Sequence, residues 1–547
     1  MISALLTGLV GGCSDAGALG TERNGCLPDK RCEAGLVCLS GLCVDPGDGG
    51  DTDTSASDAD ASGSDVDTVA DTSDTADTDT RPQSDTEGDA LVRDTSDARP
   101  EVNLPEGPLY TVADGCGRPT NLAYPDCAGV TCEEGERCMG AGLCLPAKAV
   151  ALPSFVGAQS APSLAVRDDG AWAVAYYSGT IPDGVMHVWV QVFADGGLTS
   201  SAPLMLDDDE SPRFNRTPSI AVLDNGSWFV VWRSEGVLAS DLTFRGRVVS
   251  GDGARASGPS FPVSETPFTN GGGSTNVDAP IAVTLRKGGV LVAWPAQALD
   301  SNVLGVYARR IGGLGGLLGR EIDTGATVPG VAALSPAIAP LPAGGAVLLW
   351  QSQDLRGDVK EDPEPPVIVR GRRFDSVGLP QGEVFDVTTS AFAYEALPNV
   401  TALDDTRLLV SWKTALVSTV TTAVDIRARR FPLTATALGG VGAGVEHLVG
   451  RDPSGLVPDQ AATITLVGDR ALVAWHSPDT DVNAVFGRRY YPAEDVFDCE
   501  LTNLTDGTVP VGPILPSAIA FPDGRVLVAW NSGIQPNVKT FLRFLPY

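Results

Sequence analysis

An all-β fold is predicted for most of this chain by three features of its sequence. From residue 149 onward the composition shifts to Val, Ala, Leu, Trp and Gly, and one phrase recurs through the rest of the chain. Each copy opens with a short β-branched run, passes through a turn rich in Gly or Asp, and closes an apolar run with an aromatic residue. This pattern is typical of short strands joined by tight turns.

The recurring phrase ends at seven aligned aromatic residues, Tyr176, Trp232, Trp294, Trp350, Trp412, Trp475 and Trp530. Their spacings are 56, 62, 56, 62, 63 and 55 residues, which defines seven repeats. A third strand follows in most repeats, as in FRGRVV and VFGRRYY, and a fourth is suggested by SFPVS at 260–264, GEVFDVTT at 382–389 and DVFDCEL at 495–501. Seven copies of a four-stranded unit predict a seven-bladed β-propeller over residues 149–547.

The two ends of the repeat region are expected to pair. The last repeat stops at its third strand, KTFLRFLPY, whereas the segment 149–157 precedes the first repeat. We expect 149–157 to supply the missing outer strand, because such pairing removes an open sheet edge.

Small residues and arginines recur at two further aligned positions. The small set is Ala165, Ala221, Ala282, Ala339, Thr401, Thr465 and Ala520, which suits innermost strands that converge. The arginine set is Arg247, Arg310, Arg373, Arg430, Arg489 and Arg543. These arginines either line a ligand face or, as we expect, pair with neighbouring Asp or stack on the repeat Trp. We expect the repeat Trp residues to form the core between repeats rather than a sugar platform.

The repeat pattern resembles seven-bladed β-propellers in general. A typical repeat consists of an apolar-Ala strand, a DG turn, an apolar run ending in Trp and then an R-apolar strand. This order of residues is also similar to repeats of large bacterial surface proteins. The resemblance covers about 400 residues and implies an architecture, not an activity.

Ten of the eleven cysteines are expected to form disulfides. Cys26, Cys32, Cys38 and Cys43 make one four-cysteine module at 26–43, and Cys127, Cys132, Cys138 and Cys144 make a similar one within 116–145. Units this small need cross-links, and four cysteines allow three pairings. Zinc is the alternative, but the spacings of about five residues without a nearby His fit it poorly. Cys116 and Cys499 remain, and we hypothesise that they bond to each other.

The N-terminus resembles a bacterial lipoprotein signal. In MISALLTGLVGGC a short apolar run and two glycines precede Cys13, although a basic n-region is missing. The resemblance implies cleavage of the signal segment 1–13 before a lipid-modified Cys13, and Ser14 at the next position implies export to the outer membrane or cell surface. A plain secretory signal and a buried N-terminal segment are the alternatives.

A disordered acidic linker is predicted over 45–109. Between Asp45 and Glu106 there are 16 Asp, 3 Glu and 3 Arg, a net charge of 3 − 19 = −16 out of −31 for the chain. One sign of charge and few large apolar residues cannot offset the entropy of ordering. The high overall negative charge also argues against nucleic acid as a partner.

No catalytic or cofactor motif stands out in the sequence. The three histidines, His187, His447 and His476, fall in different repeats, and no P-loop, G-x-S-x-G, H-E-x-x-H or dinucleotide-binding fingerprint is present. The acidic loop at 207–210 reads as a charged surface loop rather than a calcium site. We therefore expect no metal and no cofactor, and no catalysis.

The sequence thus predicts a lipid-anchored, monomeric cell-surface protein whose propeller binds a protein or polysaccharide partner. The expected binding loops depart from the repeat and lie at 181–189, 268–278 and 355–366. Two alternatives remain open: an extracellular polysaccharide hydrolase or lyase on a propeller scaffold, and a structural envelope component.

Overall fold

The computed structural model describes residues 37–39, 42–44, 130–138, 143–152, 158–179, 185–194, 196–208, 213–236, 238, 241–269, 279–299, 303–355, 366–388, 393–417, 422–433, 444–452, 463–478, 483–498, 501–505, 514–533 and 537–545. Every regular element in them is a β-strand, which confirms the all-β class. The described residues contain no helix long and apolar enough to cross a membrane.

The chain divides into two compact units, Met1–Glu101 and Val102–Tyr547. In the first unit, β1 (Val37–Leu39) pairs with β2 (Leu42–Val44) in an antiparallel hairpin that sets Cys38 opposite Cys43. The second unit holds all the other strands and begins with a second hairpin of β3 (Glu136–Cys138) and β4 (Cys144–Pro146).

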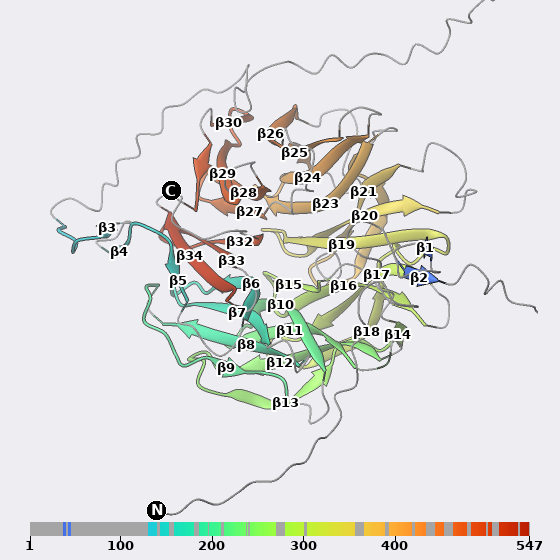
Figure 1. Ribbon diagram of the computed structural model, residues 1–547, viewed down its shortest axis with the longest axis horizontal. Helices are drawn as coiled ribbons and strands as arrows, with labels where there is room; N and C mark the ends of the chain where they lie inside the picture. Colours follow the sequence, from blue (N-terminus) through green and yellow to red (C-terminus); the bar gives the residue numbers. More distant parts are fainter. Residues whose placement is uncertain are drawn as a thin grey trace, which may run out of the picture. The chain divides into compact units, whose positions relative to one another are not determined.

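The strands of the second unit follow the seven sequence repeats (Figure 1). Repeat 1 contains β6 (Ala158–Val166), β7 (Trp172–Gly179), β8 (Met186–Phe193) and β9 (Leu204–Met205). Repeat 2 contains β10 (Phe214–Val222), β11 (Trp228–Glu235), β12 (Leu242–Val249) and β13 (Ala256–Pro262). Repeat 3 contains β14 (Phe268–Thr269), β15 (Ile281–Thr284), β16 (Val290–Ala298), β17 (Leu304–Ile311) and β18 (Leu317–Asp323).

The other four repeats use the same order. Repeat 4 contains β19 (Val331–Pro340), β20 (Ala346–Asp354), β21 (Val367–Phe374) and β22 (Pro380–Asp386). Repeat 5 contains β23 (Ala393–Ala402), β24 (Arg407–Val417), β25 (Thr422–Pro432) and β26 (Glu446–Asp452). Repeat 6 contains β27 (Thr463–Val467), β28 (Arg470–Pro478), β29 (Asn483–Tyr491), β30 (Val496–Phe497) and β31 (Thr502–Asn503). Repeat 7 contains β32 (Ile514–Ala520), β33 (Val526–Ser532) and β34 (Lys539–Leu545).

In each repeat the long strands form an antiparallel meander, whereas the short strand β14 pairs with β16, and β30 and β31 both pair with β29. In repeat 2, for example, β10 pairs with β11, β11 with β12, and β12 with β13. The turn between β10 and β11 closes on a hydrogen bond from the Gly226 N–H to the Leu223 carbonyl at 2.9 Å. Gly226 has φ 76°, a left-handed conformation that glycine adopts without a steric penalty. The DG and NG turns of the sequence thus set the meander.

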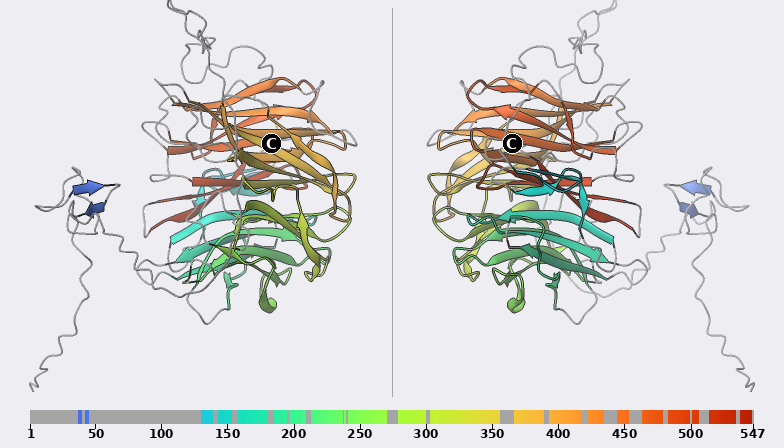
Figure 2. Two further views of the ribbon diagram at one scale, coloured as in Figure 1. Left: turned by 90° about the vertical axis from the view of Figure 1, so that its right-hand side faces the viewer. Right: turned by 90° about the vertical axis from the view of Figure 1, so that its left-hand side faces the viewer.

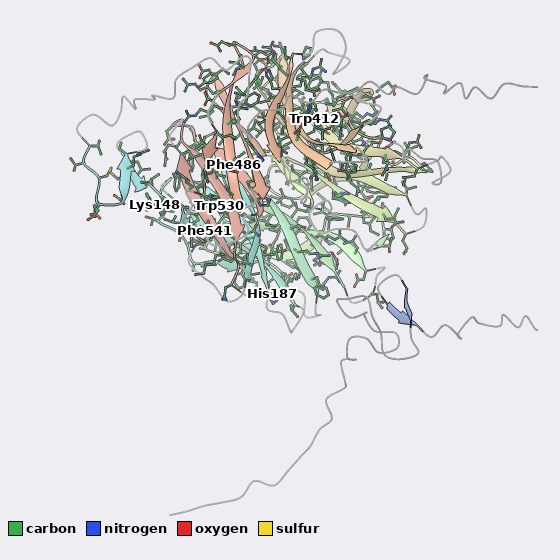
Figure 3. The ribbon with its side chains drawn as sticks, turned by 45° about the horizontal axis from the view of Figure 1, so that its top comes forward. Lys148, His187, Trp412, Phe486, Trp530 and Phe541 are labelled. Atoms are coloured by element: carbon green, nitrogen blue, oxygen red, sulfur yellow. A yellow bond between two sulfur atoms is a disulfide. The ribbon has the colours of Figure 1, made fainter. Side chains whose placement is uncertain are left out.

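Seven clusters of buried apolar side chains join each repeat to the next among the described residues. One of them packs repeat 7 against repeat 1. The seven repeat aromatics are all almost fully buried, so they form the core between repeats, as predicted. Figure 2 shows the neighbouring sheets packed face to face, and Figure 3 labels Trp412 and Trp530 within them.

The first strands of the repeats contact one another in a cyclic series. β6 contacts β10, and the contacts continue through β15, β19, β23, β27 and β32, which in turn contacts β6. In Figure 1 the repeats accordingly follow one another around a common centre. The predicted pairing of the two ends is present: β5 (Val150–Ala151) pairs antiparallel with β34, with Ala151 opposite Phe541.

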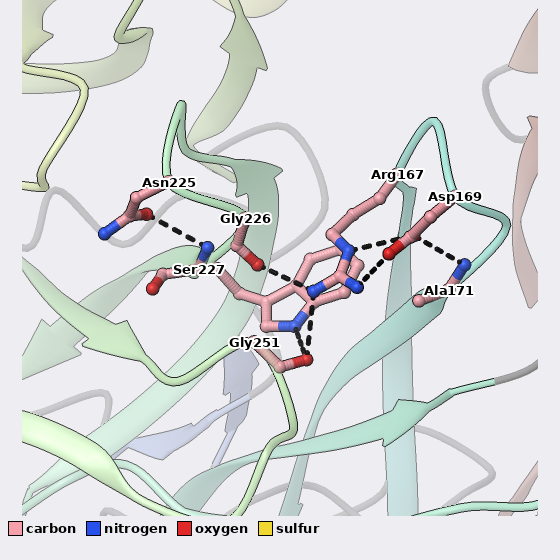
Figure 4. Close-up of polar contacts among 8 residues, drawn as sticks. Arg167, Asp169, Ala171, Asn225, Gly226, Ser227 and Gly251 are labelled. Carbon is pink, nitrogen blue, oxygen red and sulfur yellow. Dashed lines mark hydrogen bonds and ion pairs between the residues drawn. The ribbon is translucent and has the colours of Figure 1, made fainter.

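Arginines at the turns also join neighbouring repeats (Figure 4). Arg167 of repeat 1 donates to the carbonyl oxygens of Gly226 at 2.9 Å and Gly251 at 3.3 Å in repeat 2. Its guanidinium lies 5.6 Å from the Trp228 ring centroid and pairs with Asp169. A single side chain therefore fixes a turn of one repeat to two turns of the next.

Candidate functional site

The candidate site begins in the C-terminal half of the strand that carries each repeat aromatic. Side chains alternate along a strand, so the residue after the repeat aromatic faces the opposite side. In the seven repeats that residue is Tyr177, Arg233, Pro295, Gln351, Lys413, His476 and Asn531. Six of the seven are polar or ionisable, although the strands just before them are apolar. We call these seven positions the polar strand ends.

Burial makes the polar strand ends unusual. Arg233, Gln351, Lys413, His476 and Asn531 are all buried. Buried polar groups cost free energy unless they are paired, so a core that needed only packing would place apolar residues here. Because no two of the seven side chains are identical in type, the positions do not serve one repeated structural purpose.

A β-bulge in the first strand lies opposite the polar strand ends. The register shifts between Ser160 and Ser163 in repeat 1, and equivalent shifts occur in repeats 2, 4, 5 and 7. In four of these repeats the residue before a Pro takes a positive φ: Ala161 (48°), Thr217 (50°), Ser335 (52°) and Leu397 (52°). Bulges bend a strand and re-aim its side chains, which suits the edge of a functional site.

The residue after the bulge proline ties the first strands together. The Ser163 Oγ accepts the Ile220 N–H at 3.3 Å, and the Ser219 Oγ accepts the Ala282 N–H at 3.0 Å. The Asn399 Oδ1 accepts the Ile464 N–H at 3.2 Å in the same way. These cross-strand bonds were not predicted, although the PS and PN dipeptides that open several repeats are their signal in the sequence.

Repeat 2 carries the strongest cluster of charges at its strand ends. Glu235 accepts hydrogen bonds on Oε1 from Arg216 Nε at 2.9 Å, Arg216 Nη2 at 2.5 Å and Arg233 Nε at 2.5 Å. Arg213, which directly precedes β10, binds Asp241 through both Nη atoms at 3.0 and 3.1 Å. Charge-assisted bonds of this kind hold guanidinium groups in fixed orientations.

Repeats 4 and 5 meet at a second polar junction. The Gln351 Oε1 accepts the backbone N–H of Leu397, the bulge residue of repeat 5, at 3.3 Å. Glu395 is buried two residues before the bulge, and Tyr394 beside it is exposed. Glu235 and Glu395 therefore place carboxylates at the strand ends of two different repeats.

His476 is a buried imidazole at the strand end of repeat 6. Its side chain is 6% exposed, and neither ring nitrogen has a hydrogen-bond partner among the residues that the structure describes. Burial lowers the pKa of His476 to about 4, because the charged form loses its hydration. The imidazole is therefore neutral at pH 7, and one of its nitrogens can accept a proton.

The other two histidines lie elsewhere. His187 Nδ1 is 2.6 Å from the Asp207 Oδ2, and Figure 3 labels His187 at the lower edge of the strands. Asp207, at the start of the acidic loop 207–210, is buried and also accepts the Val188 N–H at 2.9 Å. His447 lies 3.4 Å from Asp495. The structure does not bring the three histidines together, and no group of three or more metal-ligand side chains occurs among the described residues.

The aligned arginines whose bonds are described contact the preceding or following repeat or, at Arg489, a residue of their own repeat. Arg247 donates to the Leu206 carbonyl at 2.6 Å, and Arg543 donates to the Leu504 carbonyl at 2.7 Å. Arg430 pairs with Asp495 at 3.2 Å, and Arg489 with Asp498 at 3.9 Å. The pairing with Asp was predicted, whereas the bonds to backbone carbonyls were not.

The cysteine predictions are tested at three positions. Cys132 and Cys144 form a disulfide across 12 residues of sequence, and Cys138 is disulfide-bonded as well. Cys13, Cys26, Cys32, Cys116, Cys127 and Cys499 lie outside the described residues, as do most of the expected binding loops. The hypothesised Cys116–Cys499 bond therefore stays a prediction.

Comparisons with known proteins give similar folds rather than a family. No protein-family model matches the sequence, and no curated protein matches it. Among solved structures, a polysaccharide lyase, Uly1, is 10% identical with a TM-score of 0.44, over 71% of this chain and 90% of its own. An ulvan lyase bound to -[GlcA(1-4)Rha3S]- is 8% identical with a TM-score of 0.45, over 70% and 93%. An α-L-arabinofuranosidase from Fusarium graminearum is 11% identical with a TM-score of 0.42, over 71% and 93%.

This comparison contradicts the prediction of a propeller that only binds and catalyses nothing. Several of the similar structures are polysaccharide lyases and glycoside hydrolases, a sialidase among them, and one is a protein of unknown function from Dyadobacter fermentans. The prediction had relied on contiguous catalytic motifs, which catalytic residues drawn from separate strands would not form.

Proposed function

We propose that this chain is a secreted carbohydrate-active enzyme that cleaves a polysaccharide, with its active site at the polar strand ends. The observation that carries the proposal is the series of buried, chemically different side chains at one aligned position: Arg233, Gln351, Lys413, His476 and Asn531. When the side chains at one aligned position differ between the repeats and are polar, packing alone does not explain them, and a functional role is favoured.

The scaffold in this proposal is a closed seven-bladed β-propeller of four-stranded blades. Support comes from the cyclic contacts of the first strands, from the seven clusters between repeats, and from the β5–β34 pairing. In such a fold the seven strand ends face one opening, so side chains from distant repeats can meet on one sugar chain.

The available side chains suit two related reactions. In hydrolysis, one carboxyl group protonates the glycosidic oxygen and a second carboxylate activates water or attacks the sugar, and Glu235 and Glu395 supply carboxylates from two repeats. In elimination from a uronate, a base takes the C5 proton beside the carboxylate and a cation stabilises the charge that develops. The bond from C4 to the glycosidic oxygen then breaks as the C4–C5 double bond forms, and the departing oxygen takes the proton back from the base. His476 is the neutral base in this scheme, and Lys413 and Arg233 are the cations.

Product analysis with the full chain tests the proposal and separates the two reactions. The purified protein is incubated with a panel of neutral and acidic polysaccharides. New reducing ends without ultraviolet absorbance indicate hydrolysis, whereas reducing ends together with the absorbance of an unsaturated uronate indicate elimination. If His476→Gln abolishes elimination but leaves the fold intact by circular dichroism, His476 is the base. If no polysaccharide in the panel yields new ends, the proposed function is wrong.

We further propose that Cys13 carries a lipid that anchors the chain, as a monomer, to the outer membrane or cell surface, with the acidic segment 45–109 as its stalk. Its partner is then a polysaccharide outside the cell. Metabolic labelling with an alkynyl fatty acid tests the anchor: wild type is expected to be labelled and Cys13→Ser is not. Equal labelling of both proteins would contradict it.

A further inference from the structure

Phe214 and Arg216 stand together at the start of β10 and break the repeat pattern. They occupy alternate positions before the bulge at Thr217, so both side chains project from the same face of the strand. At the position of Arg216 the other bulged first strands carry Ser160, Leu334, Ala396 and Ile514. No packing rule common to the repeats therefore accounts for an arginine here.

Glu235 orients the guanidinium of Arg216. Both bonds, from Nε and Nη2, reach the same oxygen, so the side-on edge of the guanidinium faces Glu235. The end-on edge formed by Nη1 and Nη2 is turned away from that carboxylate, and the side chain is 16% exposed. A guanidinium held in this manner presents a fork that matches a planar or tetrahedral anion.

Phe214 adds an apolar surface next to the arginine. Its side chain is 37% exposed, which is unusual for a large aromatic residue at the start of a strand. Aromatic rings pack against the C–H faces of sugar rings, whereas the charged fork beside it requires a negative group. The pair thus has the composition expected for a sugar that bears an anionic substituent.

We infer that Phe214 and Arg216 form a subsite for an acidic sugar, with Phe214 under the ring and Arg216 on its carboxylate or sulfate ester. This inference rests on the proposed function and specifies its substrate class as an acidic polysaccharide. The protein carries a formal net charge of −31, so a polyanion binds it only where cations are locally concentrated. Among the described residues of repeat 2, Arg213, Arg216 and Arg233 pair with two carboxylates, Asp241 and Glu235, so this cluster of side chains carries one net positive charge.

Isothermal titration of the full chain with three dextrans of matched length tests the subsite. Carboxymethyl-dextran and dextran sulfate carry the two anionic groups on one backbone, and unmodified dextran carries neither. We expect wild type to bind at least one anionic dextran more tightly than dextran, and Arg216→Gln to weaken that binding about tenfold. Arg216→Lys, which keeps the charge but loses the fork, is expected to give an intermediate loss, and Phe214→Ala weakens binding of every dextran that binds.

Arg370→Gln is the matched control, because Arg370 forms an exposed pair with Asp386 in repeat 4. It removes the same charge and is expected to bind as wild type does. Equal affinity of wild type and Arg216→Gln at unchanged thermal stability would overturn the subsite, and so would equal binding of charged and neutral dextran. Binding that depends on Arg216 without any cleavage of acidic polysaccharides would uphold the subsite and overturn the proposed enzyme instead.

Discussion

Gln159 and Thr540 are 381 residues apart in sequence, yet the backbone N–H of Thr540 donates to the Gln159 Oε1 at 3.0 Å. The Gln159 N–H donates in turn to the Val538 carbonyl at 2.9 Å, and the Leu152 N–H donates to the Thr540 carbonyl at 2.8 Å. The first and last repeats are therefore hydrogen-bonded to each other as well as packed together. Because these bonds join the first and last repeats, we expect stability to be sensitive to changes at this seam.

A substitution at Leu145, in the cysteine-rich hairpin, measures how much that hairpin contributes to the stability of the seam. Its side chain is 3% exposed and packs in the cluster between repeats 7 and 1. Leu145→Ala is expected to lower the free energy of unfolding by about 2–5 kcal/mol, because it leaves a cavity in a core. Chemical denaturation measures the change. Leu238→Ala, at a residue that is 70% exposed, is the control and should change stability by less than about 0.5 kcal/mol.

The Cys132–Cys144 disulfide holds the strand that carries Leu145. Replacing both cysteines by serine is expected to destabilise the full chain by about 3 kcal/mol, the value for closing a short loop. If the bond acts by holding Leu145 in the seam, the cost should be smaller in a chain that already carries Leu145→Ala. Fully additive costs in this double-mutant cycle would show that the hairpin and the seam are independent.

Arg525, in the turn between β32 and β33, also joins repeat 7 to repeat 1. It is buried, donates to the Gly196 carbonyl of repeat 1 at 2.8 Å, and lies 4.6 Å from the Phe521 ring centroid. Arg525→Lys keeps the charge but loses the planar fork and the stacking, so we expect a loss of about 1–3 kcal/mol in thermal unfolding. Arg286→Lys, in the exposed turn of repeat 3, should be neutral. Equal stability of the two variants would contradict this role.

The lowered pKa of His476 predicts that the protein loses stability as the solution becomes acidic. Its folded pKa of about 4 lies below the ordinary value of 6.5, so the unfolded state binds the proton first. Stability is therefore highest above pH 6.5 and falls as the pH drops towards 4, by up to about 3 kcal/mol from this group.

The variant His476→Gln should remove that part of the pH slope, since glutamine does not titrate. Asn531→Gln, at the aligned position of repeat 7, is the control and should keep the slope. Unfolding midpoints measured from pH 7 to pH 4 compare the three proteins, and an unchanged slope in His476→Gln would contradict the assignment.

Much of the fold could be predicted from the sequence because the repeat encodes it. Trp232 and its aligned partners mark the core between repeats, and the DG turns mark the meander. The segment 149–157 was expected to complete the last repeat, and Val150–Ala151 pairs with β34. These features depend on local turns and on alternation, both of which leave a periodic signal.

The candidate site could not be predicted in the same way. The polar residues at Arg233, Lys413 and His476 were visible in the sequence, but nothing local shows that they are buried or lie at equivalent strand ends. The bond between Arg216 and Glu235 joins residues 19 apart on two strands, and its meaning depends on a bulge at Thr217. The exclusion of catalysis failed for that reason, since it relied on contiguous motifs.

The central claim is an active site at the polar strand ends. Its most direct test is the release of reducing ends from acidic polysaccharides by the full chain and by two variants that each replace one carboxylate with a neutral amide, Glu235→Gln and Glu395→Gln. We expect wild type to release product and both variants to remain folded. At least one variant is expected to lose 100-fold or more in rate, roughly the size of a general acid–base contribution. Release at the wild-type rate by both variants, or no release by the wild type from any acidic polysaccharide, would contradict an active site at the polar strand ends.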